Sequence, residues 1–342
     1  MELDLMAGVA PWAETAELAR KLEAAGWSGM LFTESSQTPW ISIATAAQAA
    51  PNLTFTTGIA VAFPRSPMVA AQYAWEIAGN TGGRFRLGLG SQVKAHVERR
   101  YAADFERPAA RMRDYVLAVK ASLRAFRREE RLAHDGEFYS LSLLPAAWAP
   151  PHHDFGDVPV DISAVGPVMC RVAGEVADGV HVHPLHSSHY LHERLLPALT
   201  AGAESAGRTL DDLSLIVPVF AVPGDTPEER APLLERARTQ VAFYGSTPNY
   251  AYQFDDLGFT DLTPQLTTAM RAGDMAAMSE LVTDEVLDHF VVAAPWDDLA
   301  DRLADRYAGV ADRLVAYLGG VSIERDPTAV GRWGEIARAL RS

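Results

Sequence analysis

Short apolar runs of strand length alternate with amphipathic helical stretches along most of this chain. The pattern predicts strands over residues 3–9, 29–34, 53–62, 84–90, 160–164, 179–183, 213–222 and 314–318. Strands that are apolar along their whole length and separated by helices are typical of a parallel sheet covered by helices. Eight such units predict an α/β fold of the (β/α)8 barrel type, and a doubly wound sheet is the alternative.

Helical periodicity accounts for the segments between the strands. We expect helices over residues 14–25, 68–78, 108–127, 167–176, 190–206, 226–240, 296–308 and 326–340. A hairpin is expected at 134–141 and a proline-rich loop at 145–159. Residues 243–290 break the alternation after strand seven. We interpret them as a helical insertion near the barrel mouth, within one barrel domain that spans 1–342.

Composition narrows the function classes. Apolar residues make up 48% of the 342 residues and charged residues 22%, which favours a large core over disorder. No apolar run reaches membrane-span length, the N-terminus does not resemble a signal peptide, and Cys170 is the only cysteine. We therefore expect a cytoplasmic protein. The net charge of −14 disfavours nucleic acid and membrane as partners, but it allows one anionic cofactor held locally.

Polar and glycine residues stand where several predicted strands end, which is the end of a barrel that carries chemistry. Glu34 closes the second strand and is either a functional carboxylate or a structural one. Gly90 ends the fourth strand, Ser91 and Gln92 follow it, and Gly88 lies inside it. Glycines there allow close approach of a ligand, although such a pair is most often just a tight turn.

The turn after strand five is the best candidate for binding a phosphate. Ala164, Val165 and Gly166 precede Pro167, a residue type favoured at the first position of a helix. Free backbone N–H groups and the helix dipole attract anions at such a point. A purely structural turn would use similar residues.

Five of the ten histidines gather in one stretch, at positions 181, 183, 186, 189 and 192. His181 and His183 have strand spacing and resemble the paired histidines of metal-dependent barrel hydrolases. No matching set of further ligands follows on later strands, so we expect no metal site.

Four segments carry a resemblance to the luciferase-like family, in the expected order and over nearly the whole chain. They are GWSGMLFTE at 26–34, TGIAVAFPRSP at 57–67, GGRFRLGLGSQ at 82–92 with RPAARMRDY at 107–115, and residues 163–183. The loops SQVKAHVERRY and AFYGSTPNY look closer to the branch that uses coenzyme F420. The resemblance implies an oxidoreductase that transfers a hydride between this deazaflavin and a small organic substrate.

The resemblance also implies where the cofactor lies. The ring would rest over Gly58, Ile59 and Ala60, where the family has a non-prolyl cis peptide. The phosphate would lie at the turn after strand five, with Ser91 and Gln92 on the ribityl chain or ring edge.

Glu34 and His96 are the catalytic candidates that the resemblance places beside the ring. The alternative for His96 is an ordinary surface histidine. Ser35 stands where members often have a histidine, which puts the usual base in doubt. We assign Trp40 and His183 to the substrate side, although aromatic residues such as Trp40 are often simply core.

Three alternatives stay open at this point. The first is an FMN-dependent monooxygenase of the same family, which activates oxygen through a flavin adduct. The second is a metal-dependent hydrolase that uses the histidine cluster, and the third is a flavin-binding or structural protein without catalysis. Family members are commonly homodimers, so we expect a homodimer.

Overall fold

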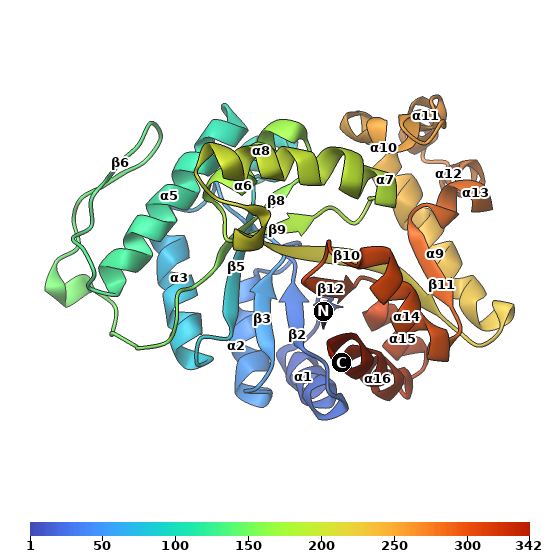
Figure 1. Cartoon of the computed structure of the whole chain (residues 1–342), viewed down its shortest axis with the longest axis horizontal. Coiled ribbons are helices and arrows are strands. Elements are labelled where there is room, and N and C mark those ends of the chain that lie inside the picture. The colour runs from blue at the N-terminus through green and yellow to red at the C-terminus, as the bar shows by residue number, and fades with distance from the viewer.

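The computed structural model of this protein describes all residues 1–342, and its centre is a closed barrel of eight parallel strands (Figure 1). The strands are β1 Glu2–Ala7, β2 Gly29–Phe32, β3 Thr54–Thr57, β5 Phe85–Gly90, β8 Val160–Ala164, β9 Gly179–Val182, β10 Ser214–Pro223 and β12 Arg313–Ala316. They follow one another in this order around the barrel, and β12 pairs with β1 to close it. Closure confirms the predicted barrel and excludes the doubly wound sheet.

Helices cover the outside of the barrel and enclose the larger of the hydrophobic cores against it. The covering helices include α1 Trp12–Ala25, α2 Pro39–Ala49, α3 Pro67–Asn80, α5 Pro108–Phe126, α6 Pro167–Val176, α8 Leu196–Ser205, α14 Trp296–Tyr307 and α16 Ala329–Arg341. Four of them (α2, α3, α5 and α6) begin with proline, whose fixed φ suits the first helical turn.

Some elements differ from the sequence pattern. The helix α2 was not predicted, because its sequence PWISIATAAQA has no charged face that would reveal a helical period. The short helices α4 Lys94–Arg99 and α15 Gly319–Arg325 were also missed. The helix expected over 190–206 is α7 Ser188–Tyr190, a π-helical turn at Leu191–Leu195, and α8. The hairpin is confirmed by β6 His134–Asp135 and β7 Ser140–Leu141.

The third predicted strand, 53–62, is divided in two. After β3 the chain passes through a cis peptide bond between Gly58 and Ile59, at the position that the resemblance implied. It resumes as β4, Ala60–Val61, which pairs with the end of β5. The break therefore lies at the carboxyl end of the barrel.

The insertion is built on an extension of β10. The first part of β10 pairs within the barrel, whereas residues 220–223 pair with β11, Val291–Ala294, a short apolar strand that the pattern did not predict. Between α9, Pro227–Gly245, and β11 the chain forms four further helices and a 3-10 turn. They are η4 Pro248–Tyr250, α10 Tyr252–Asp255, α11 Leu262–Ala272, α12 Met275–Leu281 and α13 Asp284–Asp288. These elements enclose a second core, which confirms a helical insertion after strand seven (Figure 1).

The amino-terminal end of the barrel is filled by two buried ion pairs. Asp4 accepts two hydrogen bonds from Arg313, at 2.7 and 2.8 Å, and Asp161 accepts two from Arg86 at the same distances. Both carboxylates are buried. A charge in such a place is tolerated only when it is paired, so these side chains close that end. No helix of the chain is both long and apolar enough to cross a membrane.

Candidate functional site

The carboxyl end of the barrel is partly open to solvent. Residues inside the strands are buried, whereas one residue at or just after the end of each of several strands is only half-buried. These half-buried residues are Met6, Ile59, Ser163, His183 and Tyr317. In a parallel barrel this end carries the functional loops. It is the candidate site.

Glu34 lies at this end, two residues after β2, and its carboxylate is fully engaged. One oxygen accepts hydrogen bonds from Arg65 Nη1 and from the Val61 N–H, both at 2.8 Å, and the other accepts from Arg65 Nη2. Arg65 Nη1 also donates to the Val61 carbonyl at 2.8 Å. The ion pair between Glu34 and Arg65 therefore links the end of β2 to β4. The predicted catalytic role of Glu34 stays a prediction, but the geometry adds a positioning role.

The backbone on both sides of the cis peptide is bonded to the same segment. Thr33 Oγ1 donates to the Gly58 carbonyl at 2.9 Å, and the Glu34 N–H donates to the Ile59 carbonyl at 3.2 Å. Residues 33–34 therefore support the floor of the site at 58–59.

Trp40 packs beside this pair. Its ring stacks on Tyr73 with centroids 4.7 Å apart, and the Arg65 guanidinium lies 5.9 Å from its centroid. The indole Nε1 is buried without a hydrogen-bond partner in the protein. Burial acts to lower the pKa of Arg65, but the hydrogen bonds and charge of Glu34 outweigh it and raise that pKa. The Arg65 guanidinium is therefore always protonated. The Trp40 indole N–H beside it is a donor without a partner in the protein.

The glycines of β5 allow close packing under the floor. Thr57 Oγ1 donates to the Gly88 carbonyl at 2.7 Å and accepts from the Gly88 N–H at 2.9 Å. A methyl group at Gly90 would lie 2.6 Å from the Ile59 side chain and 2.8 Å from Ser163 Oγ. Gly90 is thus required for the present position of Ile59.

Ser91, Gln92 and His96 follow on the outer edge of the mouth. Ser91 is half-buried, and Gln92 is exposed with a positive φ of 59°. His96 is exposed on α4, and its ring makes no hydrogen bond within the chain. Arg100, one turn further, donates to the Ser35 carbonyl and so holds α4 against the end of β2. The structure places all three predicted residues beside the mouth, and a contact with a ligand stays a prediction.

The turn after β8 has the properties of an anion site. Ala164 ends the strand, Gly166 is the N-cap of α6 without a side-chain cap, and Pro167 is the first helical residue. The amides of the first turn therefore have no capping partner. A methyl group at Gly166 would meet nothing within 4 Å, so space is open in front of the turn. Backbone donors at a helix N-terminus with room before them suit a phosphate.

Two tyrosines hold this turn from the side. Tyr190 and Tyr252 both donate to the Val165 carbonyl, at 2.8 and 3.1 Å. Burial raises the pKa of Tyr252 to about 12 and that of Tyr190 further, so both stay protonated donors. A cavity of ≈ 300 Å³ adjoins them, with Arg171 and Arg194 in its lining.

Tyr252 belongs to the insertion, which is thereby attached to the turn. Arg194 Nη2 donates to Asp256 at 2.6 Å, Nε donates to the same carboxylate, and the guanidinium lies 5.1 Å from the Tyr252 ring centroid. We call Arg194, Tyr252 and Asp256 the latch. Its members come from two segments of the chain, with Arg194 62 residues before Asp256, so no local pattern indicates it.

His183 follows β9 on another side of the mouth. Its Nδ1 accepts the Leu185 N–H at 3.1 Å, and its ring centroid is 4.7 Å from those of both Tyr244 and Tyr250. Burial lowers the pKa of His183 to about 4. At neutral pH the ring is uncharged, and its proton is on Nε2.

A chain of hydroxyl groups extends this aromatic cluster. Tyr317 donates to Gln240 Oε1 at 3.2 Å, which leaves Tyr244 to donate to the Tyr317 hydroxyl at 2.7 Å. Sequence reasoning did not single out Tyr244, Tyr250 and Tyr317. The first two lie in AFYGSTPNY, a segment that carried the resemblance.

The other buried histidines are separate from this site. Burial lowers the pKa of His181 to about 4, and its Nε2 lies 3.9 Å from Asp161 inside the barrel. His186 bonds to the Tyr307 hydroxyl at 3.1 Å, and burial lowers its pKa to about 3. The structure brings no three His, Cys, Asp or Glu side chains together as metal ligands.

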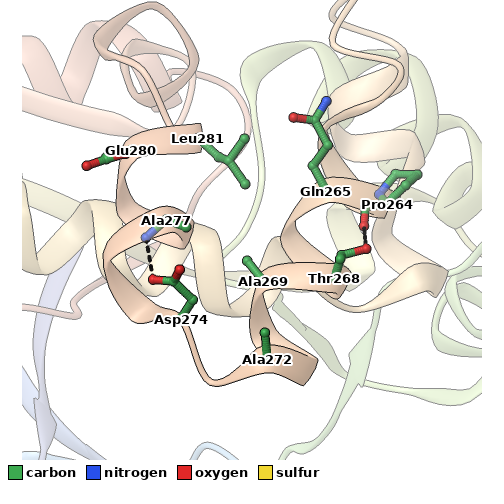
Figure 2. A pocket seen from close by; sticks show the side chains of 9 residues that line it. All are labelled: Pro264, Gln265, Thr268, Ala269, Ala272, Asp274, Ala277, Glu280 and Leu281. Atoms are coloured by element: carbon green, nitrogen blue, oxygen red, sulfur yellow. Dashed lines mark hydrogen bonds between the residues drawn. The ribbon is translucent and has the colours of Figure 1, made fainter.

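A larger groove of ≈ 580 Å³ lies between α11 and α12 of the insertion (Figure 2). Its lining consists of Pro264, Gln265, Thr268, Ala269, Ala272, Asp274, Ala277, Glu280 and Leu281. Two of its polar groups bond locally, since Thr268 donates to the Pro264 carbonyl and Asp274 caps α12. No strand-end residue lines it, so it is not the candidate site.

A closed parallel barrel with a polar, partly open carboxyl end defines a class of proteins that bind ligands at the strand ends. Residues 2–313 match the model of the luciferase-like monooxygenase family. This chain belongs to that family.

The chain is also similar to several known proteins and solved structures. An uncharacterised protein of Mycobacterium tuberculosis is 36% identical over 91% of this chain and 92% of its own length. The 5,10-methylenetetrahydromethanopterin reductase of Archaeoglobus fulgidus is 26% identical over 76% and 75% of the two chains. Two solved structures have the same fold. One is the coenzyme F420-dependent tetrahydromethanopterin reductase of Methanopyrus kandleri, with TM-score 0.77, 19% identity and coverage of 98% and 97%. The other is the FMN-bound oxygenating component of 3,6-diketocamphane monooxygenase of Pseudomonas putida, with TM-score 0.67, 16% identity and coverage of 99% and 97%.

Proposed function

We propose that this protein is an F420-dependent oxidoreductase that transfers a hydride between the deazaflavin and a small organic substrate. The observation that carries a phosphorylated ring cofactor is the uncapped turn at Val165–Gly166, with open space before it, at the mouth of a luciferase-like barrel. The fold shared with a coenzyme F420-dependent tetrahydromethanopterin reductase favours the deazaflavin branch.

The residues of the site fit a phosphorylated ring cofactor. The N–H groups of Val168 and Met169 would bind its phosphate, since Pro167 has no N–H, while Ala164 and Val165 shape the turn. Gly58, Ile59 and Ala60 would support the ring, with Gly90 beneath Ile59. When bound, the cofactor supplies the hydride chemistry, and the chain supplies orientation and exclusion of water.

The remaining predicted residues surround that position. Glu34, held by Arg65, and His96 would lie beside the ring, and Ser91 and Gln92 beside the ribityl chain. Trp40 offers its unpartnered indole N–H on one side, and His183 offers Nε2–H on the other.

The second candidate is an FMN-dependent monooxygenase. FMN also carries a phosphate, so the turn at Gly166 would serve both cofactors. The fold shared with an FMN-bound monooxygenase component favours this alternative. Only the flavin activates oxygen, so the identity of the cofactor decides the reaction class.

The test is equilibrium binding of F420 and of FMN to the purified protein, side by side, with the Gly166→Ala variant. Gly166 has φ −82° and nothing within 4 Å of an added methyl group, so the variant keeps its stability but fills the open space. We expect micromolar F420 binding, no FMN binding, and at least tenfold weaker F420 binding by the variant. Gly156→Ala, which also meets nothing, is the matched control. Binding of FMN alone would establish the monooxygenase instead, and unchanged affinity in Gly166→Ala would remove the phosphate site.

The location, oligomeric state and partners of the protein are also proposals. We propose a cytoplasmic homodimer whose partner is its small-molecule substrate, with no nucleic acid or membrane bound. The net charge of −14 supports the last point, because phosphate arrays repel an acidic surface. Light scattering of the purified protein measures the oligomeric state.

A further inference from the structure

We propose that the substrate half of this site takes an uncharged molecule with a carbonyl or hydroxyl oxygen, which accepts a hydrogen bond from His183 Nε2. The apolar part of the molecule packs against Tyr244 and Tyr250. This inference rests on the proposed function, because it assigns a substrate class to the same barrel mouth.

We call His183, Tyr244, Tyr250 and Tyr317 the aromatic wall. The order of the strands places this wall across the mouth from the proposed ring. In the closed barrel, β10 is four strands away from β3 in either direction, so the two lie opposite each other. His183 follows β9 and Tyr317 follows β12, the two strands that flank β10 within the barrel. A molecule that reaches from this wall to Ile59 would therefore contact both the proposed ring position and His183.

The hydrogen-bonding state of His183 is determined by its neighbours. Because Nδ1 accepts the Leu185 N–H, the neutral ring carries its proton on Nε2. No protein group accepts a hydrogen bond from that Nε2. The two flanking tyrosine rings, 4.7 Å away, hold the imidazole in place. Nε2–H is thus an oriented donor with no partner in the chain.

Charge is absent from the immediate surroundings of this donor. No Lys, Arg, Asp or Glu side chain forms a hydrogen bond or an ion pair with His183, Tyr244 or Tyr250. Burial is what lowers the pKa of His183 and what raises that of Tyr250. Arg236 is the one cation whose charge acts on the wall, since it opposes the rise in the pKa of Tyr317 that burial causes. Arg236 is exposed to solvent, one helical turn before Gln240.

These surroundings select against charged substrates. A carboxylate or phosphate placed here would lose its hydration without gaining a cation, which is costly. A carbonyl or hydroxyl oxygen gains the His183 hydrogen bond, and a flat or apolar body gains contact with the tyrosine faces.

The test compares cyclohexanone with 4-oxocyclohexanecarboxylate, which share the ring and the ketone and differ in one carboxylate. Isothermal titration calorimetry measures the binding of each to the protein saturated with F420 and to the protein alone. We expect cyclohexanone to bind at least tenfold more tightly than the carboxylate. His183→Phe keeps the aromatic packing and removes the donor, and it should weaken cyclohexanone binding about tenfold. His183→Ala is the second variant, and exposed His192→Phe is the control.

Equal or tighter binding of the carboxylate would overturn the inference. So would a cyclohexanone affinity that is the same in both His183 variants as in the parent. Binding of neither ketone would also overturn it. The titrations without F420 separate this outcome from a failure of the proposed function. A protein that discriminates between the ketones but does not bind F420 retains the substrate class and loses the deazaflavin.

Discussion

The carboxylate of Glu34 and the guanidinium of Arg65 form a doubly bonded ion pair that also holds both backbone groups of Val61. The side chains are 3% and 17% exposed, so the pair is largely desolvated. It connects the end of β2 to the segment that follows the floor of the site. Two residues that lie 31 positions apart in the chain therefore act as one unit.

Replacing either partner of this pair should weaken the protein and the site together. Glu34→Gln or Arg65→Met leaves one buried group without its counter-charge, which costs about 3 kcal/mol in the free energy of unfolding. The double variant should lose less than the sum of the two, because the groups interact directly. Urea denaturation of the four proteins measures this coupling.

The same four proteins separate positioning from proton transfer at Glu34. If Glu34 acts by holding β4, Arg65→Met and Glu34→Gln should weaken F420 binding to a similar extent. A loss of turnover in Glu34→Gln with cofactor affinity unchanged, and no such loss in Arg65→Met, would instead establish Glu34 as a proton-transfer group.

The latch should control affinity for the phosphate end of the cofactor. Tyr252→Phe removes one of the two hydrogen bonds to the Val165 carbonyl and preserves the ring under Arg194. We expect about fivefold weaker F420 binding, since a hydrogen bond contributes about 1 kcal/mol. Tyr73→Phe, a tyrosine change away from the turn, is the control. Equal F420 affinity in parent and Tyr252→Phe would show that the latch is structural only.

Gly90 should not tolerate a side chain. The methyl group of Gly90→Ala would lie 2.6 Å from Ile59, so Ile59 must move. We expect weaker cofactor binding and a lower unfolding temperature, whereas Gly156→Ala should leave both unchanged. Calorimetric unfolding and F420 titration check the two readouts. A Gly90→Ala protein with parental values of both would mean that Ile59 shifts at no cost.

Acid should destabilise the protein through three of its histidines. Burial lowers the pKa values of His181 and His183 to about 4 and that of His186 to about 3, below the usual value of about 6.5. Above pH 6.5 the rings are neutral in both states, and stability does not depend on them. As pH falls from 6.5 towards 4, only the unfolded chain binds these protons, so stability falls by up to about 1.4 kcal/mol per pH unit for each ring.

The measurement is urea unfolding between pH 4.5 and 7.5. His186→Phe should have a shallower dependence than the parent, by about one proton, whereas exposed His192→Phe should match the parent. A parent curve that is flat below pH 6.5 would contradict the burial of these rings as neutral groups.

The sequence by itself determined the barrel and most of its elements. Eight apolar runs separated by helices have few stable arrangements, because parallel strands need helices on their outer face. Prolines at helix starts and glycines at strand ends also marked the turns after β5 and β8 as ligand-binding candidates. These signals are local, since they depend on residues within one turn or strand of each other.

The tertiary structure alone decided how these candidates combine. It paired Glu34 with Arg65, attached Tyr252 of the insertion to Val165, and surrounded His183 with two tyrosines from a segment about 60 residues away. It also revealed α2 and β11, whose short or uncharged sequences carry no clear period. Such contacts depend on barrel closure, which joins residues far apart in the chain, and no local pattern of hydrophobic and polar positions encodes that distance.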